Sequence, residues 1–305
     1  MSTPEAAVNP PSPSADRLAR FAVSPRRRRA DVLARRLLLA GTLLALIPLA
    51  LVVYFLLHKG LGAWSESFFT TDPTGNTFFK NSTIGGIKSA ILGTIEMVAL
   101  ASLIAIPIGV GVALWLVEYG KSSWFANLVR FFVDVLTGVP SIVFGLFIYI
   151  VLVVGTGSSY AGYKGSLALS LLMLPVVIRS AEVVLLLVPN ALRESALALG
   201  AARWKVVFKI VLPTAATGML TGVLLAIARA AGETAPLLFT AATTNKTTAN
   251  LGQFMNSLPV QIYSDVTSPT QSVVNRAWGA ALTLVLLILI LNLLARLVSR
   301  RSRLA

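Results

Sequence analysis

The chain has 305 residues, of which 56% are hydrophobic and only 12% are charged. A soluble domain carries about 25% charged residues, so this composition is typical of a polytopic membrane protein. The chain has no cysteine and a single histidine, His58, which excludes disulfides and thiolate metal sites. Histidine-based metal or acid–base chemistry is nearly excluded as well. We expect neither catalytic residues nor a metal site.

The net charge of +14 is concentrated at the two ends of the chain. Eight arginines lie within residues 1–36, and four more lie within the last ten residues. Basic segments beside apolar spans set membrane topology and contact anionic membrane lipid. This distribution argues against nucleic acid as a partner.

The first 36 residues precede any long apolar run. They hold five prolines among serine, alanine and arginine, and such a segment cannot bury enough apolar surface to fold. We predict that residues 1–36 form a disordered cytoplasmic tail that fixes orientation, with a regulatory or docking role as the alternative. The run 37–57 is long enough to cross a bilayer and does not read as a cleavable signal peptide. We therefore expect a retained first transmembrane helix.

Apolar segments predict an all-α protein with six transmembrane helices. We place these helices at 37–57, 93–117, 129–154, 166–186, 214–235 and 277–298. The longer polar loops between them lie at 58–88, 187–213 and 241–275.

Charge asymmetry predicts which side of the membrane each loop occupies. Six spans put both termini on one side, and their arginines place that side in the cytoplasm. Loop 187–213 holds four basic residues against one acid, which makes it cytoplasmic, whereas loop 241–275 holds one of each and is expected outside. Loop 58–88 is then extracytoplasmic as well. We expect a multi-pass protein of a bacterial plasma membrane.

Loop 187–213 has the pattern of two short helices rather than of a simple connector. Asn190 is expected to cap a first helix after Pro189, and Gly200 suits the left-handed residue that ends it. Five residues then share one face at helical spacing: Ala191, Leu192, Ser195, Ala196 and Leu199. The small residues among them allow a partner surface to approach closely. A second amphipathic stretch leads to Pro213, which suits the start of the fifth span.

Charged residues inside the predicted spans form two candidate pairs. A charge at the bilayer centre costs at least ~2.5–3.5 kcal/mol, so it usually faces the protein and has a partner. Arg229 and Glu233 lie four residues apart, and Arg179 and Glu182 lie three apart, so each pair shares a helix face. The alternatives are structural ion pairs or an anion path, because a guanidinium matches oxyanion geometry. We favour the path for the first pair and leave the second open.

Two further acids in the spans have no evident local partner in the sequence. Glu96 lies in the second predicted span and Asp134 in the third, where we expect a structural role for Asp134. Pro140 interrupts the third span, and Gly232 with Pro236 interrupts the region around Glu233. Broken helices beside charges line pathways in many transporters, although packing kinks are the alternative.

The loop pattern resembles the EAA loop of ABC-transporter permeases. Glu194-Ser195-Ala196 is followed by Gly200 and, after nine residues, by Ile210-Val211-Leu212-Pro213, with Ser195 in place of the family's first alanine. Three further strings, 138–147, 179–182 and 229–241, are similar to permeases of the phosphate-importing ABC systems, the Pst type. The resemblance covers residues 85–300.

This resemblance implies an ABC type I importer permease fold over residues 89–299. It implies a PstC-like partner permease, two copies of a PstB-like ATPase and a PstS-like extracytoplasmic phosphate-binding protein. ATP and magnesium would be bound by the ATPase, so this chain itself would hold no cofactor. The substrate path would include Arg229 and Glu233. The residues implied in coupling to the ATPase are Glu194, Ser195, Ala196, Gly200, Leu212 and Pro213.

Three alternatives stand beside the phosphate permease. The first is a permease for another oxyanion, namely molybdate, sulfate or phosphonate. The second is a stand-alone channel or secondary transporter, which would not need the EAA-type loop and for which the sequence shows no internal repeat. The third is an intramembrane enzyme, which lacks support because no Ser/His, paired-Asp or His-metal set lies in the spans.

Overall fold

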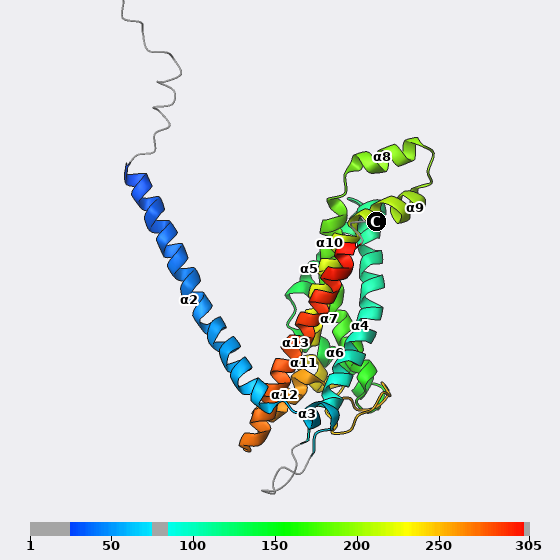
Figure 1. The fold of residues 1–305 in the computed structure, drawn as a ribbon. Helices are drawn as coiled ribbons and strands as arrows, with labels where there is room; N and C mark the ends of the chain where they lie inside the picture. The colour runs from blue at the N-terminus through cyan, green and yellow to red at the C-terminus, as the bar shows by residue number, and fades with distance from the viewer. Residues whose placement is uncertain (1–24, 75–84, 302–305) are drawn as a thin grey trace, which may run out of the picture. The chain divides into compact units, whose positions relative to one another are not determined.

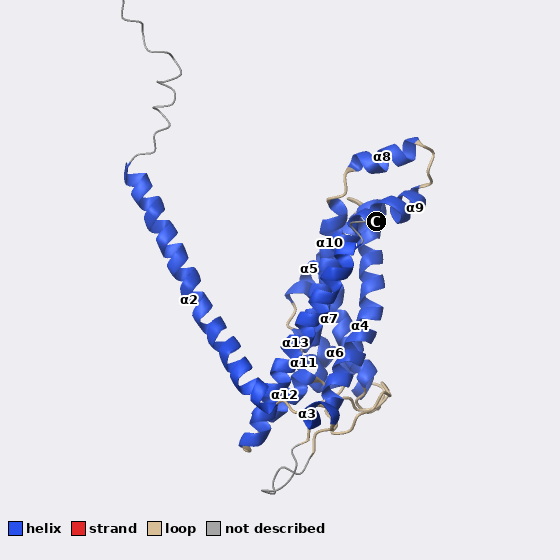
Figure 2. Cartoon of the chain, viewed as in Figure 1, coloured by secondary structure: helices blue, strands red, loops and turns tan. Residues whose placement is uncertain are grey.

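The computed structural model describes residues 25–74 and 85–301, and within these it contains helices and loops but no strand (Figures 1 and 2). The chain divides into two units, residues 1–55 and 56–305. Helix α2 (Pro25–Ala63) supplies the whole described part of the first unit.

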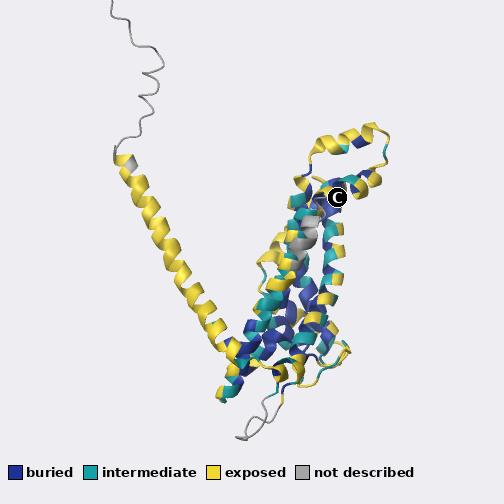
Figure 3. Cartoon of the chain, in the orientation of Figure 1, coloured by how far each residue is buried: buried dark blue, intermediate teal, exposed yellow. Residues whose placement is uncertain are grey.

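Helix α2 contains the first predicted span but begins earlier. The prediction that residues 1–36 are a disordered tail is wrong for residues 25–36, which are helical, while residues 1–24 lie outside the described part of the chain. Arginine, alanine and leucine are good helix formers and extend the apolar helix backwards, and proline is tolerated in a first turn. The most apolar part of α2 buries none of its residues within this chain (Figure 3).

The predicted loop 58–88 is also partly helical. Helix α2 continues to Ala63, and α3 (Glu66–Thr70) follows directly. The Ser65 hydroxyl accepts a hydrogen bond from the Phe68 N–H at 3.2 Å, which caps α3.

The second unit is a bundle of long and short helices. Three of its segments have π-helical geometry and continue neighbouring helices: η1 (Trp115–Gly120), η2 (Tyr149–Val154) and η3 (Val207–Val211). The remaining helices are α4 (Lys88–Leu114), α5 (Trp124–Gly138), α6 (Ser141–Ile148), α7 (Gly162–Leu186), α8 (Asn190–Ala198), α9 (Arg203–Val206), α10 (Leu212–Ala231), α11 (Ala235–Thr240), α12 (Leu258–Val266) and α13 (Gln271–Arg301).

The all-α, six-span prediction is confirmed with one modification. Within the described residues, five helices are long and apolar enough to cross a membrane, and a bent pair makes a sixth candidate. That pair is α5 with α6–η2, which replaces the continuous span predicted at 129–154 and bends by 103°. Val139 is extended because the following Pro140 disfavours a helical conformation there. The expected kink is therefore a complete break between two helices.

Close helix contacts at glycine hold the bundle together. A Cβ on Gly222 of α10 would lie 2.3 Å from the Ser180 side chain of α7, and one on Gly218 would lie 2.6 Å from Val184. A Cβ on Gly145 of α6 would lie 2.5 Å from the backbone of Pro236. Small residues permit such approaches between membrane helices, where apolar burial against lipid adds little driving force.

The fifth predicted span does not begin afresh at Pro213. Helices α9, η3 and α10 form one continuous segment, Arg203–Ala231. The π-helical segment η3 lies directly before Pro213, where a proline removes a backbone donor and crowds the preceding turn. The predicted amphipathic stretch and the fifth span therefore belong to one continuous helical segment, which ends before Gly232.

The predicted loop 241–275 contains a helix and a buried ion pair. Asp265 at the end of α12 pairs with Arg276 of α13 at 2.7 Å, and both side chains are buried. Gln261 donates to the same carboxylate at 2.7 Å. This network fixes the connection between α12 and α13.

Candidate functional site

Helices α8 and α9 form a hairpin at the end of the second unit opposite α12, hereafter the α8 hairpin, residues 189–206 (Figure 1). The predicted cap by Asn190 is wrong, because Pro189 occupies the cap position and Asn190 is already helical. The Asn190 Oδ1 atom instead accepts a hydrogen bond from Arg193 at 3.1 Å.

The prediction for Gly200 is confirmed. Its φ of +79° lies in the left-handed region, and nothing lies within 4 Å of a Cβ built there. The Gly200 N–H donates to the Leu197 carbonyl at 2.9 Å, and the Ala201 N–H donates to the Ala196 carbonyl at 3.1 Å. This pair of bonds is a Schellman motif that ends α8. Gly200 is thus needed for its backbone conformation rather than for close packing.

The α8 hairpin has one buried and one exposed face. Glu194, Ser195 and Leu199 are exposed, as a docking surface requires (Figure 3). Ala196 is buried in a cluster with Leu185 and Val206 and therefore does not share the exposed face on which the sequence analysis placed it. Leu212 packs partly against this cluster, whereas Pro213 is exposed. Ala196 and Leu212 thus hold the hairpin to the bundle.

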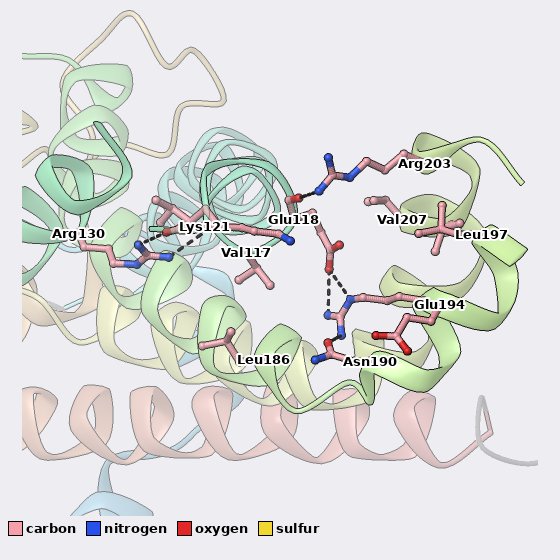
Figure 4. Close-up of a pocket in the computed structure, with 13 residues that line it drawn as sticks. Val117, Glu118, Lys121, Arg130, Leu186, Asn190, Glu194, Leu197, Arg203 and Val207 are labelled. Atoms are coloured by element: carbon pink, nitrogen blue, oxygen red, sulfur yellow. Dashed lines mark hydrogen bonds and ion pairs between the residues drawn. The ribbon is translucent and has the colours of Figure 1, made fainter. Parts of the chain in front are cut away.

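Glu118, at the end of η1, anchors the α8 hairpin (Figure 4). Arg193 donates from Nε and Nη2 to the Glu118 Oε1 atom, each at 2.9 Å. Arg203 donates to the Glu118 backbone carbonyl at 2.6 Å. The Glu118 side chain is buried, so the ion pair is shielded from solvent. Sequence reasoning missed this anchor because 75 residues separate its partners.

A cavity of about 530 Å³ lies between the hairpin and the end of η1 (Figure 4). Its charged lining comprises Lys121, Arg130, Arg193, Arg203, Glu118 and Glu194. Glu194 forms no ion pair or hydrogen bond with any residue that the structure describes. Its carboxylate is therefore available to a partner at this surface.

A network of four charged residues crosses the bundle nearby. The predicted pair is confirmed, with Arg179 Nη1 2.7 Å from Glu182 Oε2. Arg130 Nε lies 2.6 Å from Glu182 Oε1, and Arg179 also pairs with Asp134. Asp134 has no local partner in the sequence but has a tertiary one 45 residues away, in keeping with the structural role expected for it. Arg130 of α5 was missed because only the fold brings it to Glu182, 52 residues away.

This network has the properties of a structural element. The Glu182 side chain is only 4% exposed, and each of its two oxygens is held by a different arginine. Arg130 also donates to the backbone carbonyls of Lys121 and Leu116 at 2.6 and 3.2 Å. Most donors are thus committed within the protein. The geometry favours a tie between α5 and α7 over an anion path for Arg179 and Glu182.

The pair formed by Arg229 and Glu233 is longer and more exposed than the ion pairs of this network. The pairing is confirmed, but the shared helix face is wrong, because α10 ends at Ala231 and Glu233 follows that end. The Nε and Oε1 atoms are 3.6 Å apart, and the Arg229 side chain is 47% exposed. No other hydrogen bond or ion pair engages the Arg229 guanidinium in the described part of the chain. The residue lies in the last turn of α10, just before the helix ends at Gly232. A guanidinium held by one loose contact retains donors for an anionic ligand.

Glu96 is a half-buried acid with one unsatisfied carboxylate oxygen. Its Oε2 atom is buried and accepts no hydrogen bond from any residue described. The absence of a local partner in the sequence is thus matched at this oxygen by the absence of a tertiary partner among the described residues.

Comparison with known proteins places these features in a family. Residues 105–304 match the model of the binding-protein-dependent transport system inner membrane component. The chain is 39% identical over 279 residues to the phosphate transport system permease protein PstA of Yersinia pestis, covering 91% of this chain and 92% of that protein. It is 38% identical to PstA 1 of Mycobacterium tuberculosis strain H37Rv, covering 92% of each.

Solved structures show the same fold at lower sequence similarity. A bacterial alginate ABC transporter, in complex with its pentasaccharide-bound periplasmic protein, matches with a TM-score of 0.61 and 16% identity, over 90% of this chain and 96% of that one. The inward-facing MetNI methionine ABC transporter matches with a TM-score of 0.56 and 21% identity, over 69% of this chain and 94% of that one.

The Glu118 anchor predicts that Glu118→Gln loosens the α8 hairpin. Removing one charge of a buried pair costs about 3–5 kcal/mol, so amide hydrogen exchange in peptides covering residues 190–206 is expected to accelerate more than tenfold. Glu194→Gln is the matched control, since the Glu194 side chain lines the same cavity but forms no ion pair or hydrogen bond with the residues that the structure describes. Equal exchange in both variants would show that the ion pair does not anchor the hairpin.

Proposed function

The chain belongs to the family of binding-protein-dependent transport system inner membrane components and is a multi-pass inner-membrane protein, and we propose that it is a permease subunit of an ATP-driven importer of inorganic phosphate. The observation that carries the substrate class is the half-exposed Arg229, loosely paired with Glu233 within a membrane span. The phosphate transport permeases to which the chain is similar over most of its length support phosphate itself.

The proposal requires a second permease subunit. An exposed arginine in an apolar solvent is expensive, and such groups normally face protein or a water-filled cavity. A PstC-like permease would cover this face, so that each chain forms half of a pore. Arg229 would hold an oxyanion through charge-assisted hydrogen bonds, and Glu233 would release the guanidinium to it. This chain is a transport subunit and is not proposed to carry out chemistry.

The α8 hairpin is proposed to transmit force from an ATPase. Two copies of a PstB-like ATPase would bind ATP and magnesium, one against the exposed face of α8 that carries Glu194 and Ser195. The Schellman motif at Gly200 ends the helix, and the Glu118–Arg193 pair ties it to η1 at the end of α4. Because α9 continues into α10, displacement of the hairpin would reach the helix that carries Arg229.

Orientation follows from the same proposal. The α8 hairpin, with its basic residues, would face the cytoplasm together with both chain termini. The α12 end would face outward and receive a PstS-like phosphate-loaded binding protein. Membrane lipid would surround the remaining apolar faces, including those of α2.

Permeases for molybdate, sulfate or phosphonate are the alternative within the same mechanism, because an arginine recognises each of these oxyanions by similar geometry. A stand-alone channel is disfavoured by the exposed α8 face and by the family itself.

The proposed substrate predicts selective coupling in the reconstituted complex. ATP hydrolysis in lipid is expected to rise several-fold with phosphate-loaded binding protein and not with sulfate or molybdate. Stimulation by another oxyanion would keep the importer and correct the substrate. Absence of any associated ATPase activity would overturn the assignment of the α8 hairpin.

The role of Arg229 predicts loss of uptake without loss of assembly. Arg229→Gln removes a charge-assisted contact worth about 1.5–3 kcal/mol, so phosphate uptake is expected to fall at least tenfold at normal membrane levels of the complex. Arg229→Lys keeps the charge but not the forked geometry and should restore only part of the rate. Disappearance of the assembled complex would indicate a structural ion pair instead.

The role of Glu194 predicts weaker association with the ATPase. Glu194→Ala is expected to reduce co-purification of the ATPase while leaving the bundle folded, because Glu194 has no partner among the described residues. Glu66→Ala is the matched control, since Glu66 is an exposed acid in α3 at the other end of the bundle. Unchanged association and unchanged coupled hydrolysis would remove Glu194 from the interface.

A further inference from the structure

The cavity of about 530 Å³ between the α8 hairpin and η1 is lined by four basic side chains, and two of them are already paired. Arg193 lies 2.9 Å from Glu118, and Arg130 lies 2.6 Å from Glu182. Both arginines also donate to backbone carbonyls. Their charges and donors are therefore committed to holding the chain together.

The other two basic side chains, Lys121 and Arg203, keep their charges for another partner. The Lys121 ammonium forms no ion pair or hydrogen bond with any residue that the structure describes. Arg203 donates one hydrogen bond, to the Glu118 backbone carbonyl, and its guanidinium lies 5.2 Å from the centre of the Tyr119 ring. Neither contact provides a negative charge. Lys121 follows η1 and Arg203 begins α9, so the two cations reach the cavity from different elements (Figure 4).

The charge balance of the cavity favours an anionic ligand. Apart from the two ion pairs, Lys121 and Arg203 share the lining with only one acid, Glu194, which leaves a surplus of one positive charge. A phosphate group carries between about one and two negative charges at neutral pH and accepts hydrogen bonds on several oxygens. An ammonium and a guanidinium are the side-chain groups that bind such an anion best.

Lys121 also has a backbone conformation that favours glycine. Its φ is +44°, in the left-handed region that residues with a side chain rarely adopt. Two hydrogen bonds hold it there, from the Lys121 N–H to the Leu116 carbonyl at 2.8 Å and from Arg130 to the Lys121 carbonyl at 2.6 Å. Glycine would adopt this backbone without strain, so a lysine here indicates a role for its side chain.

The remaining lining of the cavity is largely apolar. It includes Leu116, Val117, Leu186, Leu197, Val206 and Val207. Apolar walls lower the local dielectric and strengthen the attraction between a bound anion and the two cations. They also suit the first carbons of an acyl chain. Free phosphate and a phospholipid headgroup present the same chemistry to this site.

We propose that the cavity binds a phosphate group between Lys121 and Arg203, either as inorganic phosphate or as the headgroup of an anionic phospholipid. This site is distinct from Arg229, which lies in the last turn of α10. A phosphate group held here bridges η1 and α9 and restrains the α8 hairpin. Only the consequence for coupling to an ATPase rests on the proposed function.

Hydrogen exchange in the assembled, nucleotide-free complex tests this site. In one arm, complexes in phosphatidylcholine nanodiscs are titrated with inorganic phosphate at constant ionic strength. In the other arm, the nanodiscs contain phosphatidylglycerol and no phosphate is added. Exchange is followed in peptides covering residues 190–206. The variants are Lys121→Gln and Lys121→Gly, and Lys205→Gln is the matched control, because Lys205 is an exposed lysine of α9 that does not line the cavity.

Exchange in the hairpin is expected to slow in at least one arm, and that arm identifies the source of the phosphate group. Linkage predicts slowing of roughly tenfold when phosphate reaches about ten times its Kd. Both Lys121 variants should lose the response, and Lys205→Gln should keep it. Because Lys121→Gly relieves the backbone strain, its loss of response separates removal of the cation from damage to the fold.

Three results would overturn the site. They are no slowing in either arm through the millimolar range of phosphate, an unchanged response in both Lys121 variants, and loss of the response in Lys205→Gln. Arg229→Gln should keep the response, and its loss there would assign the effect to the substrate path instead. The measurement requires no transport, so failure of phosphate-stimulated ATP hydrolysis would leave this inference standing.

Discussion

The cost of an unpaired charge in an apolar solvent governs this structure, because every ionic group in the spans must find a partner or water. Glu182 meets this requirement with one arginine on each oxygen, and Arg276, near the start of α13, meets it with Asp265. These closed networks tie helices together. Arg229 does not meet it within this chain, since its one contact is long and its side chain is half-exposed. The same physical constraint therefore separates structural charges from the group proposed to bind substrate.

Mechanical continuity links the two proposed sites. Glu118 holds the α8 hairpin through Arg193 and Arg203, and the cluster around Ala196 adds apolar contact. From the hairpin, one uninterrupted helical segment runs to Ala231 and carries the half-exposed Arg229 in its last turn. Glycine contacts with α7 seat that segment closely enough for movement at one end to be transmitted along it. A rigid lever of this kind is what coupling to an external ATPase requires.

Sequence signals predicted the structure correctly where the interacting residues are close together along the chain. Gly200 was placed correctly because a left-handed residue after a helix favours glycine, and the Arg179–Glu182 pair follows from helical spacing. Sequence signals failed where the burial or conformation of a residue depends on residues that are distant in the chain but adjacent in the fold. Ala196 shares a helical face with exposed residues by spacing, yet the bundle covers it. Pro140 predicted a kink, but packing of Gly145 against Pro236 accompanies a full break. The start of α2 was missed because a short arginine-rich segment is only marginally helical by itself but extends a helix that the adjoining apolar run has nucleated.

By itself the sequence determined that this protein is an all-α membrane protein with a helical EAA-type loop and an arginine–glutamate pair at the end of its fifth span, because hydropathy, charge asymmetry and short-range spacing depend on neighbouring residues. Only the tertiary structure decided which charged side chains are fully paired within the chain and which keep donors or acceptors for another partner. Arg130 reaches Glu182, Arg193 reaches Glu118, and Arg179 reaches Asp134 across 52, 75 and 45 residues. Such partners are chosen by helix packing, and no periodicity along the chain encodes them.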